Sequence, residues 1–111
     1  MNASYEEIGQ VYATFAAQEV EAGQVCKVSG NGQVSGCSAG EKFCGVVGSV
    51  RGGWAGVQIK GFARVSFTGT APATGYVQLA ADGNGGVKTA TGREYLVVSV
   101  DETAKTAVIE L

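Results

Sequence analysis

Three cysteines are the residues of this 111-residue chain whose chemistry would be most distinctive. Cys26, Cys37 and Cys44 have ten and six residues between successive thiols. Structural zinc sites usually take four thiolate or imidazole ligands, often in CxxC pairs, and a thioredoxin-like dithiol also needs CxxC. The chain has neither a CxxC pair nor a histidine. We therefore expect reduced thiols that pack as small hydrophobes. The alternatives are a three-cysteine site completed by a carboxylate, and a disulfide, for instance between Cys37 and Cys44 across a hairpin.

Other patterns that could support catalysis are weak. The absence of histidine removes Ser-His-Asp and Cys-His nucleophile systems. Lys42 stands near Cys44 but follows a turn-like stretch, so Glu41 and Lys42 are expected to be solvated at a loop end. The sequence DGNGG at residues 82–86 lacks the ending of a P-loop and is typical of a hairpin turn. We predict no catalytic residue, no cofactor-binding residue and no metal ligand, and an enzyme is the least favoured class.

Composition and charge limit the class of protein further. The chain is 45% hydrophobic and 16% charged, with a net charge of −2 and no run of lysine or arginine. A nucleic-acid-binding protein usually shows a basic patch, and a membrane-spanning helix needs about 20 apolar residues. The acidic, polar N-terminus lacks the features of a signal peptide. We expect a protein made in the cytoplasm, with neither nucleic acid nor a membrane as partner.

Alternation of apolar residues predicts the secondary structure. Residues 54–69 alternate most clearly, which indicates a half-buried strand that Gly61 would bend and split in two. Residues 11–17 also alternate, which favours a strand over the helix that their alanines would allow. Further strands are expected at residues 23–29, 32–37, 43–50, 76–80, 87–90, 94–100 and 106–111, separated by glycine-rich turns.

These elements predict an all-β fold, a small antiparallel barrel or sandwich of about eight short strands. We assign residues 11–111 to one β domain and residues 1–10 to an N-terminal arm. Four side chains lie on the less apolar side of their strands: Trp54, Phe62, Arg64 and Tyr76. Exposed aromatic residues beside an arginine are typical of a protein interface. The alternative is that these side chains pack against a second layer of the fold.

The order of these strand and turn signals resembles that of the small capsid (head) decoration and stabilisation proteins of tailed phages and prophages. The resemblance covers residues 20–111. The matching segments are residues 23–28, 43–47, 57–61, 75–79, 82–86 and 94–111. Relatives often have a proline after the first strand-opening glycine, where this chain has Gln24 and Val25.

The resemblance implies a β-tulip-like domain without catalytic residues that binds the outside of an assembled capsid, often as a trimer over a threefold site. On this hypothesis the chain is a virion structural protein at the capsid surface, made in the cytoplasm of the bacterial host. Its partners would be copies of itself, as a homotrimer, and the major capsid protein. The alternative is a carbohydrate- or receptor-binding β module of a phage fibre or tail, in which Trp54 and Tyr76 stack on sugar rings.

Overall fold

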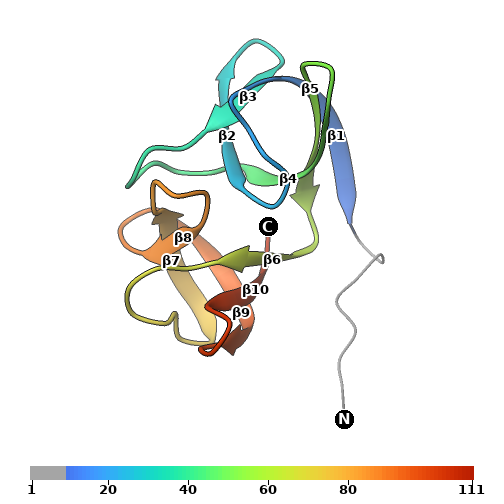
Figure 1. Ribbon diagram of the computed structural model, residues 1–111. Coiled ribbons are helices and arrows are strands. Elements are labelled where there is room, and N and C mark those ends of the chain that lie inside the picture. The colour runs from blue at the N-terminus through green and yellow to red at the C-terminus, as the bar shows by residue number, and fades with distance from the viewer. Residues whose placement is uncertain (1–9) are drawn as a thin grey trace.

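The computed structural model of the protein describes residues 10–111, which form ten β-strands and no helix (Figure 1). The predicted all-β fold is confirmed, with ten strands in place of about eight. The strands are β1 (Val11–Gln18), β2 (Val25–Gly30), β3 (Gln33–Gly36), β4 (Gly45–Arg51), β5 (Trp54–Lys60), β6 (Phe62–Ser66), β7 (Gly75–Ala81), β8 (Val87–Thr89), β9 (Arg93–Asp101) and β10 (Thr106–Glu110).

The first five strands close into a barrel in the order β1-β3-β2-β4-β5. β1 pairs in parallel with β3 and antiparallel with β5, and the other neighbours in the barrel are antiparallel. The predicted antiparallel arrangement is therefore wrong at one pair. The reason is geometric, because strand direction cannot alternate all the way around a closed ring with an odd number of strands.

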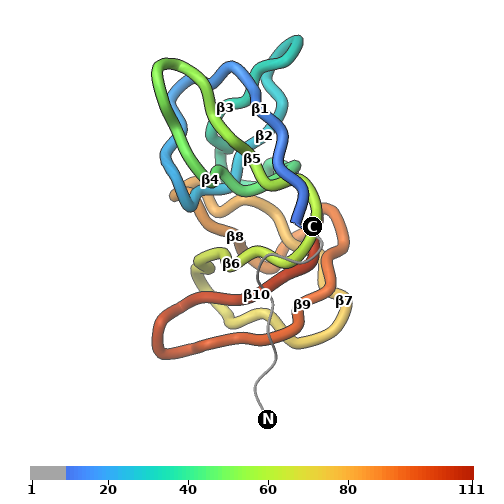
Figure 2. Tube along the Cα trace, turned by 90° about the vertical axis from the view of Figure 1, so that its right-hand side faces the viewer, coloured from blue at the N-terminus to red at the C-terminus, as the bar shows by residue number. Residues whose placement is uncertain are grey.

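The last five strands form a second, antiparallel sheet in the order β6-β10-β9-β7-β8. The chain just beyond β6 meets the other edge of this sheet through a parallel bridge between Phe67 and Val87. The Thr68 N–H also donates to the Val87 carbonyl oxygen at 3.1 Å. These contacts occupy backbone groups that an open sheet edge would leave unpaired. Figures 1 and 2 place the barrel and the second sheet at opposite ends of the molecule.

Gly61 is the point where the chain passes from one sheet to the other, and the predicted split of residues 54–69 is confirmed. Gly61 has a φ of 95°, a left-handed conformation that favours glycine. The Leu111 N–H donates to the Gly61 carbonyl oxygen at 2.9 Å. The buried Gln58 amide donates to the carbonyl oxygens of Lys60 at 3.1 Å and Phe62 at 2.8 Å. Carbonyl groups that the bend removes from one ladder thus regain partners.

The hairpin turn predicted at residues 82–86 is confirmed, and the glycine-rich turns at residues 31–32 and 52–53 also form hairpins, whereas the strands expected at residues 23–29 and 43–50 each begin two residues later. Residues 31–32, 52–53 and 82–86 each connect neighbouring antiparallel strands. Gly52 and Gly53 have φ values of 56° and 84°, as a two-residue type I′ turn requires. The strand predicted at residues 43–50 begins only at Gly45. Phe43 and Cys44 precede it because this part of the chain bonds to other segments, as described next.

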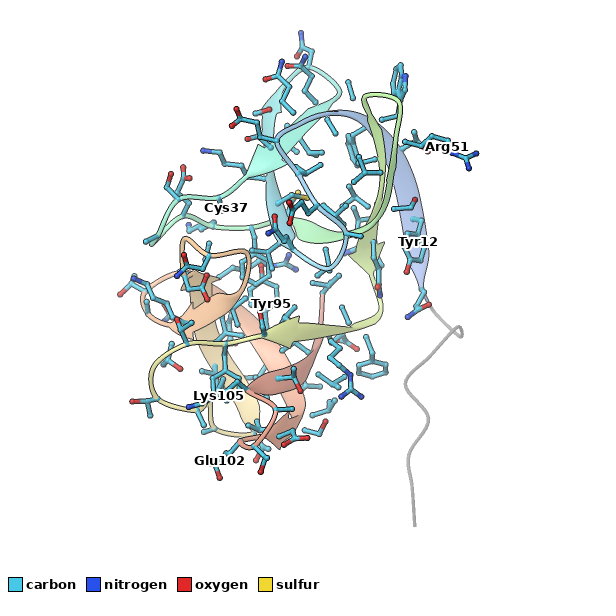
Figure 3. The ribbon with its side chains drawn as sticks, in the orientation of Figure 1. Tyr12, Cys37, Arg51, Tyr95, Glu102 and Lys105 are labelled. Atoms are coloured by element: carbon cyan, nitrogen blue, oxygen red, sulfur yellow. The ribbon has the colours of Figure 1, made fainter. Side chains whose placement is uncertain are left out.

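The loop at residues 37–44 joins the barrel to the second sheet. Gly40 N–H donates to the Ala81 carbonyl oxygen at 2.8 Å, and Ala81 N–H donates to the Glu41 carbonyl oxygen at 2.9 Å. The Phe43 ring stacks on the Tyr95 ring with centroids 4.7 Å apart and planes 4° from parallel. The Tyr95 hydroxyl donates to the Phe43 carbonyl oxygen at 2.8 Å. Figure 3 shows Tyr95 near the meeting point of the two halves.

The hydrophobic core has two clusters. One fills the barrel and consists of Cys26, Val34, Val47, Ala55 and Val57. The other lies under the second sheet and includes Val65, Leu79, Tyr95, Val97 and Ile109, together with Val25, Phe43 and Val46 from the barrel half. The second cluster therefore spans the junction of the two sheets. The assignment of residues 11–111 to one domain stays a prediction. Of the proposed N-terminal arm, residues 1–9 lie outside the described residues, and the Gln10 amide donates to the Phe62 carbonyl oxygen.

We expect Tyr95→Phe to lower the free energy of unfolding by about 1–2 kcal/mol, because the buried Phe43 carbonyl would lose its donor. Urea denaturation measures the change. Tyr76→Phe is the matched control, since the Tyr76 side chain is 71% exposed, and it should be neutral. Equal effects of the two substitutions would contradict a stabilising role for the junction hydrogen bond.

Candidate functional site

The structure brings Cys26 together with Cys44, a pair that the sequence did not single out. Cys26 is buried in β2, and Cys44 is half-buried just before β4. The Cys44 N–H donates to the Cys26 carbonyl oxygen at 2.8 Å. Both side chains pack in the barrel cluster, whereas Cys37 packs against the other one. All three thiols are free.

The two neighbouring thiols differ in acidity. A hydrogen bond donated by the Cys26 thiol lowers the pKa of Cys44 to about 7, against the opposing effect of burial. The same hydrogen bond, together with burial, raises the pKa of Cys26. Burial also raises the pKa of Cys37, to about 11. Cys44 is therefore the thiol that ionises most readily.

Metal-binding geometry is not assembled around these thiols by the part of the chain that the structure describes. Within residues 10–111 there is no group of three or more cysteine, aspartate or glutamate side chains that could hold a metal ion. The expectation that Glu41 is merely solvated is wrong. Its carboxylate accepts a hydrogen bond from the Lys27 ammonium at 2.6 Å and another from the Ser38 N–H at 2.6 Å. These bonds hold the loop at residues 37–44 against β2.

The sequence DGNGG forms the predicted hairpin turn. One Asp82 carboxylate oxygen accepts the N–H groups of Asn84 at 2.6 Å and Gly86 at 3.1 Å. The backbone donors that a bound phosphate would use are thus directed at a side chain of the same turn.

Three of the four predicted interface residues lie on one side of the second sheet. Tyr76 stands opposite Leu96, Leu96 opposite Glu110, and Glu110 opposite Phe62 in the strand registers. Arg64, two residues after Phe62, stands opposite Val108. Directly opposed residues point to the same side of a sheet. We name these six residues the second-sheet face: Phe62, Arg64, Tyr76, Leu96, Val108 and Glu110.

The second-sheet face has an apolar middle and exposed ends. Tyr76 is 71% exposed and Arg64 is also exposed, whereas Phe62 and Leu96 are half-buried and Val108 is buried. A hollow of about 360 Å³ lies beside Tyr76 and another of about 460 Å³ beside Arg64. Phe62 thus contributes to the floor of this face, while Tyr76 and Arg64 project from it.

Trp54, the fourth predicted residue, lies on the barrel and not on this face. It is the first residue of β5, directly after the turn that joins β4 to β5. It lies opposite Arg51 on β4 and Ala16 on β1, and its side chain is 57% exposed. Trp54 and Tyr76 therefore belong to different sheets.

A second group of exposed side chains surrounds Trp54. We name the outward-pointing residues of β1, β4 and β5 the barrel face: Tyr12, Thr14, Gly48, Ser49, Arg51, Trp54, Gly56 and Lys60. In Figure 3, Tyr12 and Arg51 project from the same side of the barrel. The sequence reasoning did not identify Tyr12, Arg51 or Lys60. The alternation of residues 11–17 could have identified Tyr12 as outward-pointing, because Phe15 and Ala17 point into the barrel and Tyr12 lies on the opposite side of the strand.

A scan against protein-family models finds no family that matches the chain, and a search of curated proteins finds no matching relative. No helix among residues 10–111 is long and apolar enough to span a membrane.

We expect iodoacetamide to alkylate Cys44 before the other two cysteines, at a rate that rises between about pH 6 and 8 as its thiol ionises. Peptide mass spectrometry after timed quenching identifies the modified residue. Cys44→Ala should remove the fast phase, whereas Cys26→Ala should move its pH midpoint upward by removing the donor. Faster alkylation of Cys37 at pH 7 would contradict this ranking.

Proposed function

We propose that the chain is a non-enzymatic structural protein of a phage virion that decorates and stabilises the capsid surface. The observation that supports this best is the second-sheet face, on which Phe62, Arg64 and Tyr76 share one side of four adjacent strands. Its proposed mechanism is burial of apolar surface against the capsid lattice and between subunits.

The chemistry of the second-sheet face suits a protein partner. Tyrosine and arginine are enriched among residues that dominate binding energy. The Arg64 guanidinium has no carboxylate within 4.0 Å in residues 10–111, where Lys27 and Glu41 form the ion pair. It is therefore available for a bidentate bond to a partner carboxylate. The exposed Glu110 offers the opposite charge on the same face.

A homotrimer is the proposed assembly. In a closed ring of three copies, each copy contributes two different patches to its neighbours. Light scattering should then give a mass of about three times 11.2 kDa. A mass of one chain at every concentration, in solution and on capsids, would rule out the trimer.

We expect the protein to co-sediment with shells assembled from the major capsid protein of the same genome. Tyr76→Ala and Arg64→Glu should each weaken this binding by about tenfold or more, because they remove the projecting groups of the second-sheet face. Val28→Ala is the control, since Val28 is 57% exposed on β2 of the barrel. Failure of the unmodified protein to co-sediment would overturn the capsid role. Binding that all three variants retain equally would overturn the assignment of the face.

A further inference from the structure

We propose that the barrel face is a binding site for an acidic oligosaccharide, with Tyr12 and Trp54 as stacking platforms and Arg51 and Lys60 as partners for carboxylate groups. This inference does not depend on the capsid role, because it concerns a different sheet and different residues.

The two aromatic side chains stand apart on one continuous surface. Tyr12 is 54% exposed and Trp54 is 57% exposed. In the register of β1 and β5, Tyr12 lies opposite Gln58, and Trp54 lies opposite Ala16. Four residues of strand therefore separate the backbone positions from which the two side chains project, a distance of roughly 13 Å at about 3.3 Å per residue. A single sugar ring cannot contact both platforms, whereas an oligosaccharide can.

Small residues keep the strip between the rings open. A Cβ atom on Gly48 would lie 2.8 Å from Cε2 of Tyr12, so the tyrosine ring lies against the Gly48 backbone. A Cβ atom on Gly56 would lie 3.0 Å from the Ser49 hydroxyl oxygen. An open groove of about 470 Å³ occupies the Trp54 end of the strip, and Thr14 and Ser49 line it. Their hydroxyl groups can donate to and accept from sugar hydroxyls.

The charge of the barrel face favours an anion. Arg51 lies opposite Trp54, and Lys60 lies opposite Val11, next to Tyr12, so one exposed cation stands near each ring. β1, β4 and β5 contain no aspartate or glutamate, although the whole chain has a net charge of −2. The ion pair of residues 10–111 joins Lys27 to Glu41, so within that part of the chain neither Arg51 nor Lys60 has a carboxylate within 4.0 Å.

The geometry of the barrel face fits an acidic oligosaccharide better than an acidic peptide or a single-stranded nucleic acid. An acidic peptide that binds by strand addition needs a free sheet edge, and the barrel is closed. Single-stranded nucleic acid is usually held by a groove whose cations follow the backbone, whereas the barrel face has two cations. The apolar faces of sugar rings can stack on Tyr12 and Trp54, and uronate carboxylates can pair with Arg51 and Lys60.

Trp54 is the single tryptophan of the chain, so its fluorescence reports binding directly. We would titrate the full chain with hexasaccharides of alginate, hyaluronan and polygalacturonate, and with neutral cellohexaose. At least one acidic hexasaccharide should change the fluorescence in a saturable way and bind about tenfold or more tightly than cellohexaose. Added salt should weaken binding of the acidic hexasaccharide and leave binding of cellohexaose unchanged.

Variants locate the site. Tyr12→Ala, Arg51→Gln and Lys60→Gln should each weaken the acidic ligand by about fivefold. Binding by Trp54→Ala is measured by calorimetry, because this variant lacks the single tryptophan of the chain. Its affinity for the acidic hexasaccharide should also fall by about fivefold. Val28→Ala and Lys42→Gln are the controls for an exposed apolar side chain and an exposed cation elsewhere. Arg51→Gln changes an exposed side chain, so its effect on binding is separable from loss of folding, which thermal unfolding monitors.

The proposal is overturned if none of the acidic hexasaccharides binds, if cellohexaose binds equally well, or if the variants and the controls behave alike. Tighter binding of oligo(dT) or polyglutamate at the same residues would also overturn the sugar assignment. Co-sedimentation with capsid shells distinguishes the two proposals, because the barrel-face variants should retain it even if sugar binding is lost.

Discussion

The contact between Phe43 and Tyr95 fixes how the barrel and the second sheet are joined. Tyr95 is 2% exposed, and its ring and hydroxyl both engage one residue of the loop at residues 37–44. The hydroxyl gives the Phe43 carbonyl a donor that a buried loop would otherwise lack. The same loop shares two backbone hydrogen bonds with Ala81. Because stacking and hydrogen bonding act on the same segment, the two sheets bury a common core between them.

Gly61 has the complementary role of separating the outward side chains into two faces. The apolar alternation continues on both sides of it, but its inward members serve different cores: Val57 faces the barrel cluster, and Val65 faces the second cluster. The outward residues are separated in the same way. Trp54 falls on the barrel, and Phe62 falls on the second sheet. One glycine in a left-handed conformation thus divides a single sequence pattern between two surfaces.

Local patterns of the sequence predicted most strands and hairpins, because each depends on a few neighbouring residues. The alternation around Gly61 and the Asp-Gly and Asn-Gly turns are examples. Sheet order, the parallel pair of β1 and β3, and the pairing of Cys26 with Cys44 depend on distant segments and could not be read from local pattern. The stack of Phe43 on Tyr95 joins residues 52 positions apart. The start of the strand near Phe43 was wrong for the same reason, since that distant contact draws the residue out of the sheet.

For the candidate sites too, the sequence predicted what depends on local pattern and missed what depends on distant segments. Alternation correctly indicated that Tyr76 and Arg64 face outward, but it could not reveal that they share a face from which Trp54 is excluded. That grouping depends on the registers of β6, β10, β9 and β7.

The two faces differ in charge, and this difference determines which kind of partner each face can bind. The second-sheet face combines Arg64 with Glu110, so it can complement a protein surface of mixed charge. The barrel face has cations and no carboxylate, so it favours an anion. A protein attached through one face would leave the other accessible. If both proposals hold, many copies on one capsid would present many weak sugar sites together, and effective concentration would strengthen attachment without any change in the individual site.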